Sequence, residues 1–377
     1  MPAALVILVP GLLGFERLGR LSYFTDVEPL LRGPFSAAGI DLRVQVVSPP
    51  PSSSLETRAA RLAEAIAEQP GDEPIHIVGH STGGLDTRLL LSPGISLPTE
   101  VDVEAAARRV RSAVSLSTPH HGAPLAVAFT GVQGHRWMSF VSRLLTRLLR
   151  SGSGPRRTLI ETGLVVLHLD RIAGVDPRVC DPLCDAIEGA ADESSRALDP
   201  AIVEWLHEIG QDGSLLEQLT PSAVARLTAT LQTRPTVRYG SVATVAPSPR
   251  LRPLVSWRSS RYARASAGLY ALLHRLAGGA TRRSSPMPSG DQLRTLERDL
   301  GAVPSRRDND GFVPTRSQVW GSLITAVQGD HLDLMGYYGG YPERPRLDML
   351  VSGAPFDSRD FEDTWKAIAG FMLEVAA

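Results

Sequence analysis

The chain has 377 residues, of which 43% are hydrophobic and 21% are charged. This composition excludes disorder of the whole chain, and the length suits one α/β domain that carries a large insertion. The net charge of −1 creates no overall field that would attract nucleic acid or an anionic membrane, so we expect no nucleic-acid partner.

The N-terminal segment 3–13 is apolar, but no lysine or arginine precedes it and no small-residue cleavage site follows it. We therefore predict a strand there rather than a signal peptide, and we expect a cytoplasmic protein. No apolar window reaches about 18 residues, so no membrane-spanning helix is expected. The spacing of Cys180 and Cys184 favours two packed thiols over a disulfide scaffold, a zinc site or a redox pair.

The first predicted strand is the apolar run 5–9, and it leads into the loop 10–15, which reads P-G-L-L-G-F. A second strand is predicted over 42–47 and a helix over 55–68, where apolar residues recur at helical spacing. Ser53 with Glu56 is typical of a capping box at the start of that helix.

The segment 75–85 reads I-H-I-V-G-H-S-T-G-G-L, an apolar run that ends in a serine flanked by glycines. A strand followed by G-x-S-x-G and a helix is the context of a nucleophile elbow, so Ser81 is the candidate nucleophile. Side chains at Gly79 and Gly83 would collide with the neighbouring strand and helix. The alternative is a purely structural Ser-Gly turn.

Acyl transfer at Ser81 requires two backbone N–H donors for the oxyanion of the tetrahedral intermediate. One donor comes from the residue after the nucleophile and the other from an early strand-to-helix loop, which makes Thr82 and Leu12 the candidates. A simple hydrophobic turn is the alternative for the loop that contains Leu12.

A further strand is predicted over 110–117, followed by the segment 117–122, which reads S-T-P-H-H-G. Elbow enzymes carry their residues in the order serine, acid, histidine, so His120 and His121 are expected to order a loop rather than to catalyse. The strand pattern then stops, and the segment 123–235 is predicted to be an inserted helical cap. It contains an amphipathic helix over 137–150, which either packs on the core or acts as a lid that makes transient contact with a lipid interface.

The core resumes with a strand over 236–245. An insertion over 247–286 carries eight arginines and a predicted helix over 262–276. We favour a solvated surface segment there over a phosphate or membrane contact. The last helix is predicted over 359–375, with its aromatic and aliphatic side chains turned inward.

Several motifs resemble, in order, those of the bacterial true-lipase family of α/β hydrolases. The loop 10–15 is similar to the family's H-G-L-x-G-F, although Pro10 replaces the histidine. The segment 117–122 is similar to S-T-P-H-x-G, and 309–314 to N-D-G-L-V-P. The resemblance implies that Asp310 is the triad acid, with Asp308 as the competing aspartate, and that His331, in an H-L-D motif, is the base. It also implies that Asp86 and Arg88, after the elbow, tie the helix down rather than react.

In calcium-binding members of that family, the aspartate of H-L-D binds a structural Ca²⁺ together with a second aspartate. The resemblance therefore makes Asp333 a candidate ligand, with Asp291 as its partner. An ion pair or a capping role is the alternative. No cofactor is expected for the chemistry itself.

We therefore predict an α/β-hydrolase fold, with a mostly parallel central sheet flanked by helices and an inserted helical cap. The core is assigned to 1–122 and 236–377, the cap to 123–235 and the arginine-rich insertion to 247–286. The expected function is hydrolysis of hydrophobic carboxylic esters by Ser81, His331 and Asp310 through an acyl-enzyme. The alternatives are an acyltransferase, a hydrolase of phospholipids or polyesters, and a catalytically silent binding protein.

Overall fold

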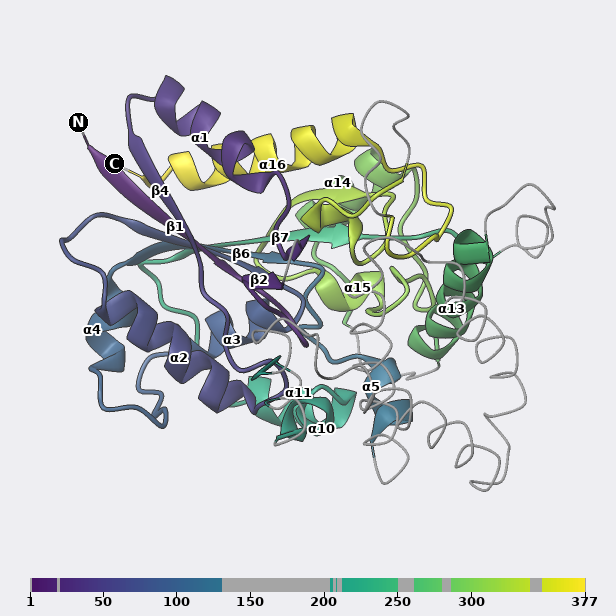
Figure 1. The fold of residues 1–377 in the computed structure, drawn as a ribbon, viewed down its shortest axis with the longest axis horizontal. Coiled ribbons are helices and arrows are strands. Elements are labelled where there is room, and N and C mark those ends of the chain that lie inside the picture. The colour runs from purple at the N-terminus through teal and green to yellow at the C-terminus, as the bar shows by residue number, and fades with distance from the viewer. Residues whose placement is uncertain are drawn as a thin grey trace.

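The computed structural model describes residues 2–18, 21–130, 204–205, 208, 212–249, 261–279, 286–339 and 348–376. They form a six-stranded sheet in the order β4-β1-β5-β6-β7-β8, in which every neighbouring pair is parallel (Figure 1). The strands are β1 (Ala3–Val9), β4 (Asp41–Val46), β5 (Ile75–His80), β6 (Val110–Leu116), β7 (Arg238–Thr244) and β8 (Ser322–Val327). A short antiparallel ribbon pairs β2 (Arg17–Leu18) with β3 (Leu21–Ser22). The predicted parallel sheet is confirmed.

Helices cover both faces of this sheet, which explains why β5 is buried along its whole length and β1 at every residue but the first. Successive residues of β1 face opposite sides: Ile7 packs toward α2 (Leu55–Ala67), α3 (Thr82–Leu90) and α4 (Val103–Arg108), whereas Val6 packs toward α1 (Val27–Ala37) and α16 (Ser358–Leu373). Alternation of this kind follows from the two-residue period of a strand. The two helical layers lie on opposite sides of the sheet in Figure 1.

The register of the strands gathers their carboxyl ends at one edge. Val9 at the end of β1 is paired with Gly79, and His80 at the end of β5 is paired with Leu116. In open parallel sheets, ligands bind outside this edge. The loops that follow β1, β5 and β6 therefore meet where the sequence predicts a site.

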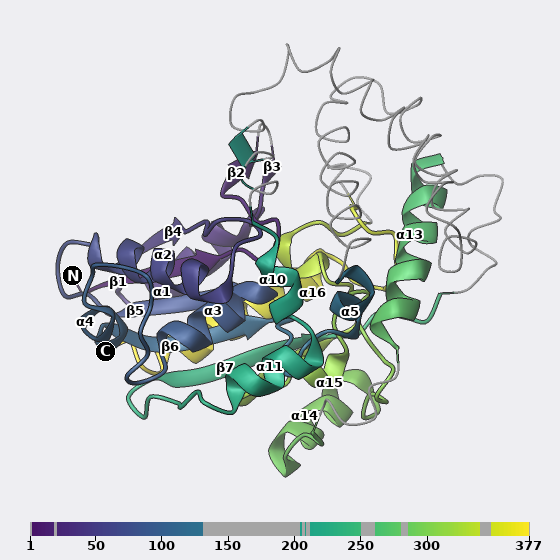
Figure 2. The ribbon, with the colours of Figure 1, turned by 90° about the horizontal axis from the view of Figure 1, so that it is seen from below.

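Three helices of the predicted cap lie within the described residues: α5 (Pro124–Phe129), α10 (Ser214–Gln218) and α11 (Pro221–Thr228). Figure 2, seen from below, shows them close together on the near side of the sheet. Most of the cap, including the amphipathic helix predicted over 137–150, falls outside the described residues. Within the described residues, no helix is long and apolar enough to cross a membrane.

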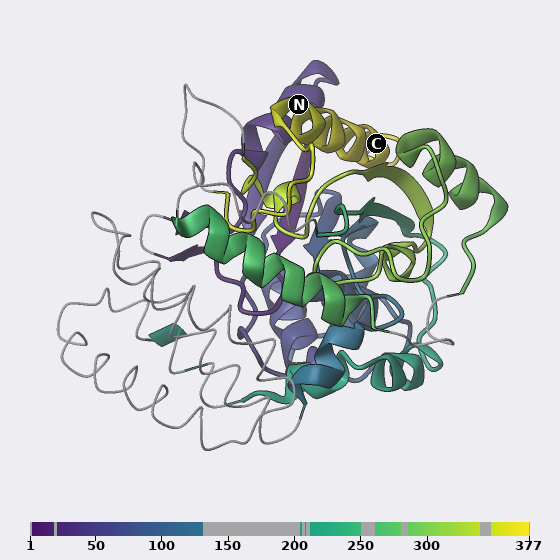
Figure 3. The ribbon, with the colours of Figure 1, turned by 90° about the vertical axis from the view of Figure 1, so that its right-hand side faces the viewer.

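The arginine-rich insertion contains α13 (Arg261–Ala277), which confirms the predicted helix. One face of this helix packs on the core beside α5 (Figure 3). Of the eight arginines of the insertion, only Arg275 has a described side chain, and it is exposed, so the preference for a solvated surface segment stays a prediction. Tyr270 is 1% exposed and Leu273 is 7% exposed, and both pack with Leu125 of α5. Farther along the chain, α14 (Gly290–Leu300) packs on β8, and the short helices α15 (Thr315–Gln318) and η3 (Asp333–Met335) lie in the loops around it.

Candidate active site

Ser81 lies between β5 and α3 in a backbone conformation that few L-residues adopt, with φ of 53° and ψ of −123°. The turn is tight: a Cβ atom on Gly79 would lie 2.4 Å from the Gly83 carbonyl oxygen, and one on Gly83 would lie 2.3 Å from the Val9 carbonyl oxygen. Both contacts are too short for any side chain, so glycine is required at both positions. The geometry is that of the predicted nucleophile elbow, which stores backbone strain at the serine.

His331 joins Ser81 to Asp310 through two hydrogen bonds. Its Nε2 lies 3.0 Å from the Ser81 Oγ, and its Nδ1 lies 2.7 Å from the Asp310 Oδ2. Because a carboxylate oxygen can only accept, Nδ1 carries the proton and Nε2 is left to accept one from the serine hydroxyl. The structure thus brings together the three residues that the sequence predicts for catalysis.

Asp310 is buried and held by hydrogen bonds on both oxygens. Its Oδ1 accepts from the backbone N–H groups of Phe312 (2.9 Å) and Val313 (2.7 Å). Its Oδ2 accepts from the Thr244 hydroxyl (2.9 Å) and the Gln318 amide (3.1 Å) in addition to His331. Sequence reasoning missed Thr244 and Gln318, since neither lies in a catalytic motif.

The competing aspartate, Asp308, lies apart from this network. One of its oxygens accepts the backbone N–H of Ser305 at 2.6 Å, and its backbone carbonyl accepts from Thr315. Asp308 therefore shapes the loop that presents Asp310.

The loop after β1 lies directly against the nucleophile. A Cβ atom on Gly11 would lie 2.7 Å from the Ser81 Cβ, which puts the neighbouring Leu12 peptide beside the serine. Thr82 is the first residue of α3, so its N–H has no acceptor within the helix. Among the hydrogen bonds of the described chain, neither the Leu12 N–H nor the Thr82 N–H donates to another residue. Both groups are therefore available to a ligand oxygen, as the oxyanion-hole prediction requires.

A buried arginine that sequence reasoning missed supports the oxyanion loop. Arg58 of α2 is fully buried and donates through Nη2 to the carbonyl oxygens of Pro10 (2.9 Å) and Gly11 (3.4 Å). Its Nη1 donates to Pro50 (2.8 Å). Arg58 thus contacts the backbone carbonyl oxygen of Pro10. Because every residue has this oxygen, the contact does not depend on whether position 10 is proline or histidine.

Asp86 pairs with Arg58 rather than with Arg88. The carboxylate accepts Arg58 Nη2 at 2.7 Å and Nε at 3.0 Å, and both side chains are fully buried. Burial raises the pKa of Asp86 to about 6, and the Arg58 guanidinium opposes that rise. Arg88 instead lies over the Trp320 ring at 4.8 Å from its centroid, and burial lowers its pKa to about 10. The expected structural role of Asp86 agrees with this geometry, and its partner lies 28 residues earlier in the chain.

The other motif histidines are bonded elsewhere. His120 is buried and its Nε2 lies 2.8 Å from the Ser115 Oγ, while the His121 backbone N–H donates to the Ser317 Oγ at 3.1 Å. Burial lowers the pKa of both imidazoles, and the charge of Arg88 lowers it further. These contacts agree with the expected loop-ordering role.

His76 on β5 supplies a pH-dependent contribution to stability that a single variant can isolate. It is buried against Ser112, and burial lowers its pKa to about 4. As the pH falls from about 6.5 to about 4, the unfolded chain binds a proton that the folded chain excludes, so this contribution to stability is lost. The loss is about 3 kcal/mol. Several buried carboxyls with raised pKa values change the stability in the opposite direction, so the test compares the variant with the wild type over the same pH range.

Below pH 6.5, the free energy of unfolding measured by urea titration should fall less steeply in His76→Asn than in the wild type. Equal slopes would contradict this assignment.

Apolar side chains border the base. The Phe312 ring stacks on His331 with centroids 4.9 Å apart and 26° between the planes. Phe312 and Leu332 are partly buried and pack, with Phe129 of α5 and Leu276 of α13, against the cluster that contains Tyr270. The site therefore has an apolar wall built from the triad loops and from the insertion helix.

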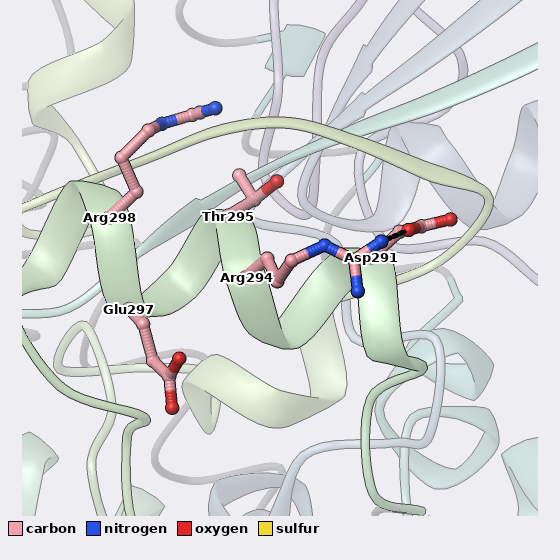
Figure 4. A pocket seen from close by; sticks show the side chains of 5 residues that line it. All are labelled: Asp291, Arg294, Thr295, Glu297 and Arg298. Atoms are coloured by element: carbon pink, nitrogen blue, oxygen red, sulfur yellow. Dashed lines mark hydrogen bonds and ion pairs between the residues drawn. The ribbon is translucent and has the colours of Figure 1, made fainter.

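The two candidate calcium ligands lie in different surroundings. Asp291 sits on the surface of α14 with its side chain 87% exposed, and it reaches Arg294 in a shallow surface hollow (Figure 4). Asp333 is 3% exposed, and its Oδ2 accepts the Asp330 backbone N–H at 2.7 Å. Burial raises the pKa of Asp333, and the charge of Asp330 raises it further. Asp291 does not fit as the second ligand, and the described residues contain no group of three or more His, Cys, Asp or Glu that could hold a metal ion. The hydrogen bond from Asp330 lies in the turn that carries His331, as the capping alternative expects.

Comparisons with known proteins agree with this architecture. No protein-family model matches the chain. A triacylglycerol lipase of Pseudomonas fragi is 28% identical over 124 residues, which cover 32% of this chain and 36% of that protein. The chain thus matches about a third of that relative's length.

Among solved structures, the Staphylococcus hyicus lipase matches with a TM-score of 0.53 at 14% identity. The match covers 98% of this chain and 95% of the lipase chain. Lipase 1 from Pelosinus fermentans has a TM-score of 0.50 at 17% identity, with 98% and 99% covered. The structural similarities confirm the α/β-hydrolase fold, and the partial match to the Pseudomonas fragi protein agrees with the resemblance to bacterial lipases.

Proposed function

We propose that this α/β hydrolase of the bacterial lipase and esterase type cleaves hydrophobic carboxylic esters, with Ser81 as the nucleophile. The observation that carries the proposal is the hydrogen-bonded series from Ser81 through His331 to Asp310, with the serine on a strained elbow. A structural Ser-Gly turn has no need for a buried imidazole and carboxylate aligned on its hydroxyl.

In the acylation step, the Ser81 Oγ attacks the ester carbonyl carbon while His331 Nε2 takes the hydroxyl proton. The carbonyl oxygen becomes an oxyanion, which the Leu12 and Thr82 N–H groups stabilise by donating to it. The tetrahedral intermediate then collapses, the bond to the alcohol oxygen breaks, and His331 gives its proton to the departing alcohol. Asp310 holds the imidazole in the tautomer needed and stabilises the imidazolium.

Deacylation repeats these steps with water. His331 takes a proton from water, the resulting nucleophile attacks the acyl-enzyme, and the carboxylic acid leaves as the proton returns to Ser81. An alcohol in place of water would give acyl transfer by the same residues. Hydrolysis is the proposal, and an acyltransferase or a hydrolase of phospholipids or polyesters is the alternative that uses the same site.

The substrate class follows from the wall beside the base. Phe312 stacks on His331, and Leu332 and Leu276 pack against the same apolar cluster as Phe312, which suits an aliphatic chain more than a charged or sugar-like group. The proteins similar to this chain include a triacylglycerol lipase and lipases of the same fold. A transient contact between the cap and a lipid interface belongs to the same proposal.

A chromogenic short-chain ester tests the proposal directly. The wild type is expected to release the chromophore, and Ser81→Ala is expected to release it several orders of magnitude more slowly. A folded wild type without turnover on esters of any chain length would favour a catalytically silent binding protein. Product analysis in the presence of an alcohol acceptor separates hydrolysis from acyl transfer.

The chemistry proposed here needs no cofactor, because the chain itself supplies nucleophile, base and oxyanion donors. EDTA is therefore expected to leave kcat unchanged for protein that stays folded. A structural Ca²⁺ at Asp333 makes a separate prediction, a melting temperature that falls with EDTA and recovers with calcium. Thermal scans that superimpose with and without the chelator would leave Asp333 with its turn-capping role alone.

A further inference from the structure

The residue that precedes the nucleophile belongs to a hydrogen-bonded series that the proposed mechanism does not use. His80 Nε2 lies 2.9 Å from the backbone carbonyl oxygen of His331, and His80 Nδ1 lies 2.8 Å from the Tyr23 hydroxyl. The same hydroxyl oxygen accepts the Gly11 backbone N–H at 2.9 Å. The series therefore connects the base loop to the loop that follows β1.

The series has a carbonyl oxygen at one end and a backbone N–H group at the other, and these two groups fix the direction of every hydrogen bond between them. A carbonyl oxygen only accepts, so His80 Nε2 must carry the imidazole proton and His80 Nδ1 must accept. Tyr23 then donates its hydroxyl proton to His80 Nδ1 and accepts from Gly11. Each polar atom is satisfied once, and no other tautomer satisfies all of them.

Burial keeps both side chains in the required neutral forms. His80 is 1% exposed; burial lowers its pKa well below the ordinary value, and the neighbouring His331 lowers it further. Burial also raises the pKa of the Tyr23 hydroxyl. Rings pack on both sides, with the His80 centroid 4.7 Å from His331 and the Tyr23 centroid 5.7 Å from Phe15. The series stays intact across the pH range in which a histidine base operates.

The two ends of the series are the parts of the site whose relative position must stay fixed during acylation. Gly11 precedes Leu12, whose N–H is a proposed oxyanion donor, and the Gly11 peptide packs on Ser81. His331 is the proposed base. Oxyanion donors stabilise the transition state only when they are already aimed at the position where charge develops.

We propose that Tyr23 and His80 are positioning residues that fix the position of the oxyanion loop relative to the base around Ser81. This inference rests on the proposed ester hydrolysis. Loss of the Tyr23 hydroxyl leaves the Gly11 N–H and His80 Nδ1 buried without partners, and the Gly11–Leu12 peptide is then free to turn away. The effect is on the transition state, so kcat falls while KM stays near its wild-type value.

Steady-state kinetics on a soluble ester, together with melting temperatures, test the inference with four variants. Tyr23→Phe is expected to lower kcat by about 10- to 100-fold, as small displacements of reacting groups do, with KM within about twofold of the wild type. His80→Leu should lose at least as much. His80→Gln should recover most of the rate, because a carboxamide donates to the His331 carbonyl oxygen and accepts from Tyr23.

The matched control is Tyr239→Phe, which removes a partly buried tyrosine hydroxyl that accepts the Arg234 backbone N–H away from the triad. It should leave kcat unchanged. The positioning role is overturned if Tyr23→Phe matches the wild type in kcat, or if His80→Gln is as impaired as His80→Leu. A wild type that turns over no ester overturns the proposed function and this inference with it, whereas an active wild type with an equally active Tyr23→Phe overturns only the inference.

Discussion

Replacing Ser81 by alanine is expected to lower kcat for ester hydrolysis by about 10⁴- to 10⁶-fold, leaving only the catalysis that substrate binding and the oxyanion donors supply. His331→Ala should cost about as much, because the serine hydroxyl is a weak nucleophile without a base that takes its proton. Asp310→Asn should cost about 10⁴-fold, because an amide at this position no longer enforces the tautomer that leaves Nε2 free to accept.

These losses should not add when the substitutions are combined, since the three residues act as one unit. The measurement is kcat on a chromogenic ester, with the melting temperature of each variant recorded on the same preparation. Ser81→Ala should also relieve little of the backbone strain, because the elbow glycines and not the serine side chain impose the turn.

The motif histidines beside the site are the matched controls for this assignment. The His120 side chain is bonded to Ser115, whereas His121 reaches Ser317 through its backbone N–H, which alanine keeps. Replacing either by alanine should therefore act at most through loop order and leave most of the activity. Silencing by His120→Ala or His121→Ala, with His331→Ala still active, would show that the base has been assigned to the wrong residue.

The parts of this molecule that sequence predicts well are those where a local pattern meets a strong steric rule. A short apolar run that ends at a glycine or proline is typical of a buried strand, and G-x-S-x-G after such a run indicates the tight turn observed at Ser81. The C-terminal helix is similar: its predicted inward side chains, Phe361, Trp365 and Ile368, are all buried in α16.

The parts that sequence missed depend on contacts between distant segments. Arg58 looks like an ordinary polar position of an amphipathic helix, and only the fold places it between Asp86 and the loop after β1. The capping prediction failed for a smaller reason: α2 begins at Leu55 as predicted, but its N-cap is Ser54 rather than Ser53, and the Ser54 side chain accepts the Thr57 N–H. Helix ends are decided by which of two neighbouring serines reaches the free N–H groups. The insertion helix α13 has a buried face that its arginines did not suggest, because Tyr270 and Leu273 determine where it packs.

Removing one partner of the Arg58–Asp86 pair is expected to destabilise the fold by about 3–5 kcal/mol, because the remaining charge is buried without compensation. Asp86→Ala leaves the guanidinium with carbonyl acceptors only. Arg58→Met leaves the Asp86 carboxylate unpaired. It also leaves the carbonyl oxygens of Pro10 and Pro50, which accept from Arg58 at 2.9 Å and 2.8 Å, without a donor. Urea unfolding at neutral pH, where the pKa of about 6 keeps Asp86 ionised, measures both costs.

The two variants should differ in activity even where their stabilities agree. Arg58→Met removes the donor that holds the oxyanion loop, so at a temperature where the variant is fully folded kcat should fall while KM changes little. Asp86→Ala keeps the contacts of Arg58 with Pro10 and Gly11, so it should retain more of kcat. The matched control lies on the same helix: Arg61 is 40% exposed and pairs with Glu64 and Glu68 at the surface, so Arg61→Met should change stability by no more than about 1 kcal/mol. If Arg58→Met is no more costly than Arg61→Met, the buried pair does not support the loop, and the support of the oxyanion hole must be sought in the Tyr23–His80 series alone.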